Sequence, residues 1–221
     1  MKINMKNKII ITLLASIFSL NVYAQKETAS PLDLVKPVIK PVQLKKINKE
    51  SLEVLNTTLR TNDYFKLFEI TSSLVKDEDY INFLLSKVNE GHPPIYWLMA
   101  DYYSLNNNPK ESHKWYYIAI IMTQQDSALC LDLSARFSSQ KIMKFFPEAL
   151  TVTRQTPQFI QPAMTEVIFF LENIKQRANP TWACSFGDNE YMYPFEKTIK
   201  SHLWSNKREE VLKKFSSPYS K

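Results

Sequence analysis

Eight consecutive apolar or aromatic side chains, from Trp115 to Met122, leave one stretch of this sequence without a polar face at any helical phase. As a helix the run would rise only about 12 Å, which is too short to cross a bilayer. A helix that is apolar all round in a water-exposed chain has to be covered on every side. We therefore expect a central helix that is sandwiched between neighbouring helices.

Glycine is rare in this sequence, which contains only Gly91 and Gly187. Phosphate-binding loops and dinucleotide fingerprints need several glycines where the backbone approaches a ligand. Tight β-hairpin turns also need residues that tolerate positive φ. The composition therefore favours an all-α fold and disfavours phosphate-cradling enzymes; we expect no cofactor.

The first 24 residues have the layout of a secretory signal peptide. Three lysines precede a twelve-residue apolar run, Ile9 to Leu20, and a small residue precedes the expected cleavage site between Ala24 and Gln25. An uncleaved anchor is the weaker alternative, because a spanning helix needs about 20 apolar residues. We expect a periplasmic, soluble protein without a stable membrane anchor after cleavage.

The positive charge is concentrated partly in this leader. Without its three lysines the formal net charge falls from +6 to about +3. The remaining basic clusters, around Lys45 and around Lys213, alternate with apolar or acidic residues, whereas nucleic-acid binders usually show a concentrated basic stripe. We expect solvated helix faces and no nucleic-acid partner.

Two cysteines, Cys130 and Cys184, are present. In an oxidising compartment a single pair is more often a disulfide than two free thiols. We therefore predict that they are bonded.

The chain is expected to comprise the signal peptide, an extended proline-containing arm at 25–46 and a helical domain at 47–221. In the arm, Pro31, Pro37 and Pro41 each remove a backbone donor and favour extended geometry.

Capping signals and apolar spacing predict antiparallel helices along the domain. Helices are expected after Asn48, after Asn62 or Asp63 with Phe65 and Phe68 inward, after Asp77 or Asp79 with Leu84 and Leu85 inward and Gly91 beyond its end, from Pro93–Pro94, and from Pro109. Further helices are expected over 131–146, 162–177 and 205–216, the last with Asn206 and Glu209 as a capping box. Residues 179–195 are expected to be irregular.

One segment, 96–119, carries a recognisable pattern of aromatic and small residues. Tyr96, Leu98 and Tyr102 match the first helix of a repeat, while Met99 replaces the usual glycine; Trp115, Tyr116 and Ala119 match the second, with Ser112 as its small residue. The segment resembles a tetratricopeptide hairpin of the Sel-one-like kind. Real arrays need about three repeats, so a degenerate array and a helical bundle with one such hairpin both remain open.

No catalytic or metal-binding signature stands out. The three histidines, His92, His113 and His202, lack the i, i+4 spacing of a helical zinc pair. The acidic run at 77–79 could serve glycosidase chemistry, but acids are also favoured in the first turn of a helix by its dipole. We expect a non-enzymatic protein, with an envelope hydrolase as an unlikely alternative.

Aromatic residues are the strongest sign of binding, because tyrosine and tryptophan are enriched at interface hot spots. We predict partner contacts from Tyr103, Tyr117 and Trp97, together with Lys110 and Lys114. The exported helical hairpin with a disulfide resembles immunity proteins, which implies a protein that neutralises a secreted toxic effector by occluding it. A scaffold or accessory factor in cell-envelope assembly or secretion is the main alternative.

Overall fold

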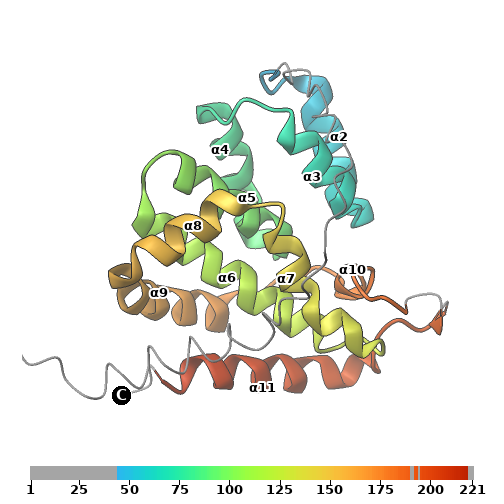
Figure 1. Ribbon diagram of the computed structural model, residues 1–221. Helices are drawn as coiled ribbons and strands as arrows, with labels where there is room; N and C mark the ends of the chain where they lie inside the picture. The colour runs from blue at the N-terminus through green and yellow to red at the C-terminus, as the bar shows by residue number, and fades with distance from the viewer. Residues whose placement is uncertain (1–43, 190–191, 194, 219–221) are drawn as a thin grey trace, which may run out of the picture. The chain divides into compact units, whose positions relative to one another are not determined.

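The computed structural model describes residues 44–189, 192–193 and 195–218, and these residues are all-α, as predicted (Figure 1). No β-strand occurs in these ranges; two isolated bridges join Lys45 to Leu74 and Cys130 to Thr198. The predicted signal peptide, its predicted cleavage site and arm residues 25–43 lie outside the described residues. Of the arm, Lys45 pairs with the chain at 73–75, where its amide donates to the Ser73 carbonyl at 2.9 Å.

The helices are α2 (Lys49–Thr61), α3 (Tyr64–Ser72), α4 (Glu78–Ser86), α5 (Pro93–Leu105), α6 (Pro109–Ser127), α7 (Ser138–Met143), α8 (Pro147–Gln155), α9 (Ile160–Asn173), α10 (Thr181–Cys184) and α11 (Trp204–Ser216). Within the described residues, 3₁₀ turns lie between them at Val88–Glu90, Leu133–Phe137, Pro157–Phe159 and Ser201–Leu203.

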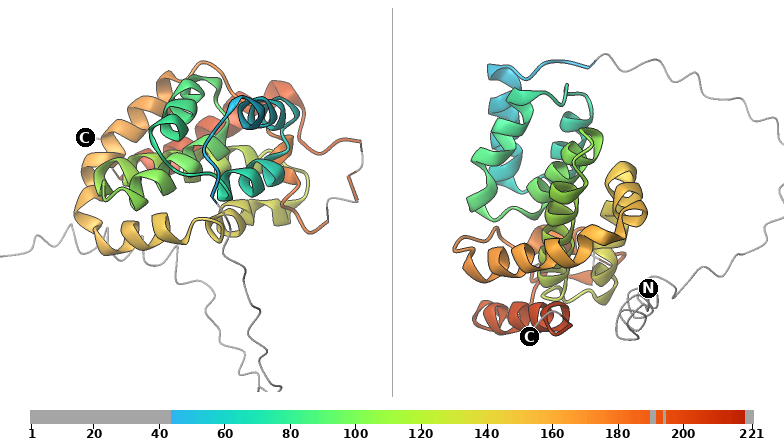
Figure 2. Two further views of the ribbon diagram at one scale, coloured as in Figure 1. Left: turned by 90° about the horizontal axis from the view of Figure 1, so that it is seen from above. Right: turned by 90° about the vertical axis from the view of Figure 1, so that its left-hand side faces the viewer.

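The central position predicted for the run Trp115–Met122 is confirmed. This run lies in α6, which contacts α5, α7, α8, α9, α10 and α11. Every side chain in it is buried except that of Tyr117, which is partly exposed. Figure 2 shows α2, α3 and α4 towards one end of this helical body and α11 at the other, with α6 between them.

The predicted helix starts in the first half of the domain are confirmed. Asn48, Asp63 and Asp77 each cap a helix through a side-chain oxygen that accepts a backbone N–H. Pro93 and Pro109 open α5 and α6, and Gly91 ends the 3₁₀ turn before α5 with φ of 70°. Two side chains predicted to face inward, Phe65 and Leu85, are instead exposed.

Helices α5 and α6 form the hairpin on which the repeat resemblance was based. The small Ser112 lets the two helices approach, and its hydroxyl donates to the Ala100 carbonyl of α5 at 3.1 Å. Tyr96 and Trp115 stack across the pair with ring centroids 5.9 Å apart. Membership in a tetratricopeptide array stays a prediction.

Three predictions about helices in the second half were wrong. The single helix expected over 131–146 is divided into a 3₁₀ turn and α7, and α8 follows. The Asp132 carboxylate caps the 3₁₀ turn by accepting the Ser134 amide at 2.9 Å. Pro147 disfavours helical geometry at Phe146, which has φ of −129° and ψ of 59°.

The other two corrections concern α9 and α11. Helix α9 ends at Asn173 instead of 177, because Ile174 turns to extended backbone. The capping box expected at Asn206 is wrong, since α11 already begins at Trp204. The indole of Trp204 donates to the Ile199 carbonyl at 2.9 Å, which fixes the entry to this helix by another contact.

The predicted disulfide is present: Cys130 and Cys184 are bonded, with their Cα atoms 5.4 Å apart. Both residues are buried. The bond joins the chain after α6 to the short helix α10. It therefore holds the segment 179–189, which contains only that one short helix, against the helical body.

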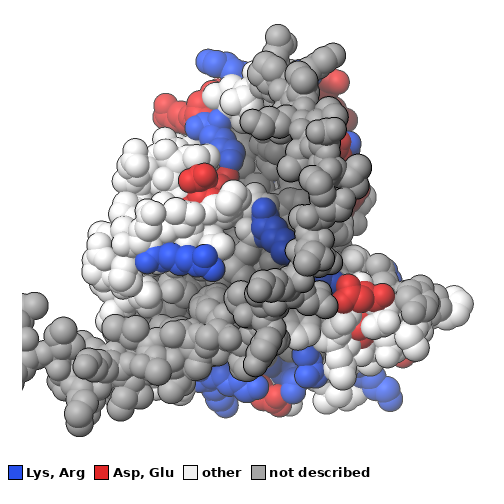
Figure 3. All heavy atoms as spheres, in the orientation of Figure 1, with Lys and Arg blue, Asp and Glu red and all other residues white. Residues whose placement is uncertain are grey.

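No helix in the described part of the chain is long and apolar enough to cross a membrane. Charged side chains are sparse over α8 and gather along α11 on the face seen in Figure 3. Some of the basic residues in the cluster around Lys213 pair with acidic residues of α11 itself, as in Lys207–Glu210 and Lys213–Glu209. These pairs are the arrangement expected of a solvated helix face.

Candidate functional site

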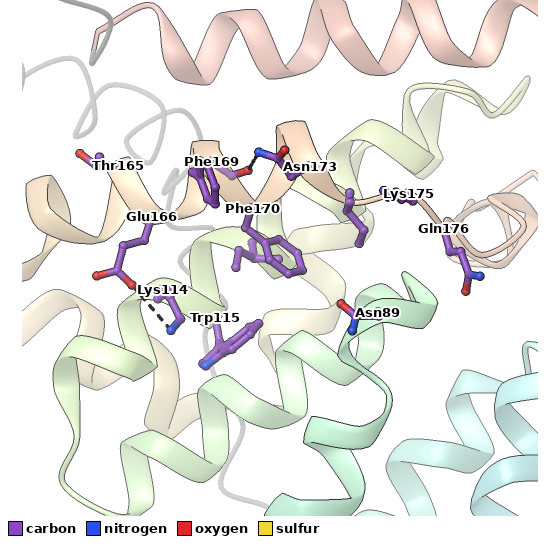
Figure 4. A pocket seen from close by; sticks show the side chains of 12 residues that line it. Asn89, Lys114, Trp115, Thr165, Glu166, Phe169, Phe170, Asn173, Lys175 and Gln176 are labelled. Carbon is purple, nitrogen blue, oxygen red and sulfur yellow. Dashed lines mark hydrogen bonds and ion pairs between the residues drawn. The ribbon is translucent and has the colours of Figure 1, made fainter.

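A groove of about 780 Å³ runs between α6 and α9 (Figure 4). Its floor comes from α6 and from the inner face of α9. One end is bounded by the 3₁₀ turn Val88–Glu90 and by the extended residues 174–176 that follow α9. The groove therefore combines three segments that are far apart in the sequence.

The floor of the groove is an interlocked set of aromatic rings. Trp115 stacks on Tyr96, and Phe170 meets both rings edge-on, at centroid distances of 5.9 and 5.6 Å. The hydroxyl of Tyr96 donates to the Val88 carbonyl at 2.6 Å, which ties this cluster to the end wall. Because these three rings pack against one another, the shape of the floor is set before any ligand binds.

Phe169 lies at the rim of this floor and is 69% exposed. Its neighbour Phe170 packs into the core cluster. Successive residues in a helix are about 100° apart, so on a helix that packs through one face, only one of two adjacent phenylalanines can face the core. The adjacent pair Phe169–Phe170 was therefore a sequence signal, not used in the predictions, that one large apolar side chain of α9 is exposed.

At one end of the groove, the two lysines predicted to contact a partner meet an acidic residue of α9. Lys110 and Lys114 both approach Glu166, with N–O distances of 3.1 and 3.7 Å. Lys114 also pairs with Glu111 at 2.6 Å and lies over the Trp115 ring, 4.8 Å from its centroid. Figure 4 shows Lys114 and Glu166 pointing toward one another. Two cations and two carboxylates are balanced here.

At the other end, Gly91 permits a very close approach between two segments. The Ala178 amide donates to the Gly91 carbonyl at 3.1 Å. A Cβ atom on Gly91 would lie 2.0 Å from the carbonyl oxygen of Gln176. The glycine therefore supplies both the positive φ that ends the 3₁₀ turn and the space for the chain that follows α9. Only the first of these roles was predicted from the sequence.

Replacing Gly91 by alanine should lower the free energy of unfolding by about 2–3 kcal/mol, since the new side chain adds a left-handed backbone penalty and an overlap with Gln176. Urea unfolding of both proteins measures the difference. Asn107→Ala is a matched control, because Asn107 has φ of 54° and is exposed. That control should cost about 1 kcal/mol; equal losses in the two variants would contradict the importance of the close approach.

The segment that forms the end wall is anchored by a buried ionic network. Arg177 donates to the Asp126 carboxylate of α6 at 2.8 Å and to the Gln125 amide oxygen at 2.8 Å. Arg208 of α11 also donates to Asp126, at 2.9 Å, and the Trp182 indole donates to its second oxygen at 2.9 Å. Burial lowers the pKa of the Arg177 guanidinium, and the Asp126 carboxylate opposes that effect. This network fixes the position of residues 174–178 beside the groove.

The aromatic residues predicted to contact a partner do not line this groove. Tyr103 and Tyr117 are partly exposed on α5 and α6 and pack against Tyr102 and Tyr116. Trp97 has no exposed surface; its indole donates to the Thr123 hydroxyl at 3.0 Å. Because Trp97 is part of the core, we leave it out of the proposed binding surface. Of the predicted set, Lys114 lines the groove, and Lys110 lies beside it through its ion pair with Glu166.

Two of the three histidines, His92 and His113, and the acidic residue Asp77 make contacts within the fold, whereas His202 is exposed. His92 hydrogen-bonds with the Tyr64 hydroxyl at 2.7 Å, and the His113 ring hydrogen-bonds to the Pro109 carbonyl at 2.8 Å. Burial lowers the pKa of both imidazoles. Asp77 caps α4. Within the described residues, no three histidine, cysteine or acidic side chains are grouped so that they could hold a metal ion.

The chain matches no protein-family model, no curated protein and no solved structure. In its described residues the chain is an all-α protein with a largely apolar groove between two of its helices.

Proposed function

We propose that this protein acts by binding another protein, and that the groove between α6 and α9 receives a segment of that partner. The observation that carries the proposal is the exposed Phe169 beside a floor of packed rings. Exposed aromatic side chains next to a fixed apolar surface are typical of interface hot spots. Covering Phe169 would contribute about 1.5–3 kcal/mol to binding.

Within that class, we propose an exported immunity protein that neutralises a toxic effector by occluding it. The layout of residues 1–24 as a signal peptide supports export, and the Cys130–Cys184 disulfide suits an oxidising compartment. The resemblance of the α5–α6 hairpin to protein-binding repeats supports a partner that is itself a protein. A scaffold for envelope assembly would use the same groove with a different partner, and the experiment below separates the two.

The test uses the gene beside the one that encodes this protein. If the neighbour encodes a toxin, export of that toxin should kill cells that lack this protein, and co-expression of this protein should restore growth. The Phe169→Asp variant should lose protection and weaken the complex with the purified toxin at least about tenfold, because it places a charge against the apolar floor.

The matched control is Phe195→Asp, since Phe195 is almost fully exposed and lies outside the groove. It should protect as well as the wild type does. Protection that is unchanged by Phe169→Asp would remove the groove from the interface. A neighbouring gene without toxicity, whose product nevertheless binds through Phe169, would favour the assembly scaffold.

A further inference from the structure

We propose that the occupant of the groove is an extended segment that carries a carboxylate near a large apolar side chain. This inference rests on the proposed function and names the chemistry of the partner. It depends on three features of the groove: the unequal charge at its two ends, the free amide groups at one end, and the rigidity of the wall that bears them.

The two ends of the groove differ in how far their lysines are paired with acidic residues. Lys114 and Lys110 are compensated by Glu111 and Glu166. At the other end Lys175 is exposed, and it makes no ion pair within the described part of the chain. Figure 4 shows these two ends on opposite sides of the aromatic floor. The unbalanced cation complements an acidic group on the partner, close to the side chain that covers the floor.

Asn89 and Gln176 line the same end of the groove as Lys175, from opposite walls. Across residues 44–189, neither side-chain amide makes a hydrogen bond to another described residue. Each amide offers two donors and an acceptor. An extended backbone needs such partners when it leaves water, whereas a helix satisfies its own peptide groups. The free amides therefore favour an extended segment over a helix laid in the groove.

The wall that carries Lys175 and Gln176 is held in place from both sides. The next residue, Arg177, is bound to the buried Asp126 carboxylate, and Ala178 is hydrogen-bonded to Gly91. The backbone that carries Lys175 and Gln176 is thus positioned before the partner binds. Such preorganisation reduces the ordering cost of association.

The experiment pans a library of random peptides, displayed on phage, against the disulfide-bonded protein. We expect the enriched peptides to combine aspartate or glutamate with a nearby large apolar residue. The best of them is then synthesised with a fluorescent label, and its affinity is measured by polarisation. Lys175→Glu should weaken binding about fivefold, and more at low salt. The double variant N89A/Q176A should weaken it about tenfold.

Controls separate this chemistry from a general loss of the groove. Lys144→Glu makes the same change of charge at an exposed lysine outside the groove and should leave the affinity unchanged. A peptide with lysine in place of its acidic residue should bind the Lys175→Glu variant better than it binds the wild type.

No enrichment, or enriched peptides with basic residues or with apolar residues at helical spacing, would overturn the inference. If the toxin depends on Phe169 while the selected peptides lack acids, the groove remains the binding site and only this occupant is wrong. If acidic peptides bind but Phe169→Asp still protects cells, the proposed function fails instead.

Discussion

We expect the Asp126→Ala variant to lose about 3–5 kcal/mol of its free energy of unfolding, which is a large part of the stability of a typical domain. The Asp126 side chain is fully buried and accepts hydrogen bonds from Arg177, Arg208 and Trp182. Its removal leaves two guanidinium groups in a largely buried site without their counter-charge. The indole N–H of Trp182 also loses its acceptor. The melting temperature should fall on the order of 10 °C.

The matched control is Asp188→Ala, which removes an aspartate that also has a cationic partner. Asp188 pairs with Lys141 at 2.5 Å, but its side chain is largely exposed. Exposed pairs contribute about 0–1 kcal/mol, so this variant should unfold almost as the wild type does. Asp126→Asn should also be strongly destabilised: the amide keeps one hydrogen-bond acceptor, but the negative charge that balances the two arginines is lost. Equal stability of the Asp126 and Asp188 variants would show that the network does not hold α11 and the end wall.

The helix starts and the burial of α6 could be predicted from the sequence because both depend on residues that are close together in the chain. Asn48, Asp63 and Asp77 each act on backbone amides within the next three residues. The apolar circumference of α6 likewise required burial, whatever its neighbours were. The predictions failed where distant segments decide the structure. Helix α9 stops at Asn173, and the next few residues are bound to Gly91 and Asp126 instead.

The two ends of the candidate site likewise differ in whether local sequence could predict them. Lys110 and Lys114 were predicted from the sequence as charged partner contacts; Lys114 lines the groove, and Lys110 pairs with Glu166 beside it. The other end of the groove depends on the contact between Gly91 and residues 176–178, which are about 85 positions away along the chain. No periodicity or cap in either segment reports that contact. Trp97 was wrongly predicted to contact a partner, since its side chain is part of the core.

We expect the loss of the disulfide to have a comparably large effect. Replacing both Cys130 and Cys184 by alanine should lower the free energy of unfolding by about 4 kcal/mol, since the bond closes a loop with a sequence separation of 54 residues. The reason is mainly that the unfolded chain gains conformational freedom. Guanidinium unfolding of the oxidised wild type and of the double variant measures the difference.

Reduction provides the control without any substitution. Dithiothreitol should shift the unfolding midpoint of the wild type to near that of the double alanine variant, and should not shift the variant itself. The neighbouring contacts should survive in the folded, reduced protein, because the Ser138 hydroxyl still donates to the Ala183 carbonyl and Trp182 still donates to Asp126. The groove should then bind its partner with unchanged affinity as long as the protein is folded. An unfolding midpoint that does not respond to the reductant would contradict a stabilising role for the bond; weaker binding by the folded, reduced protein would instead show that the bond also shapes the groove.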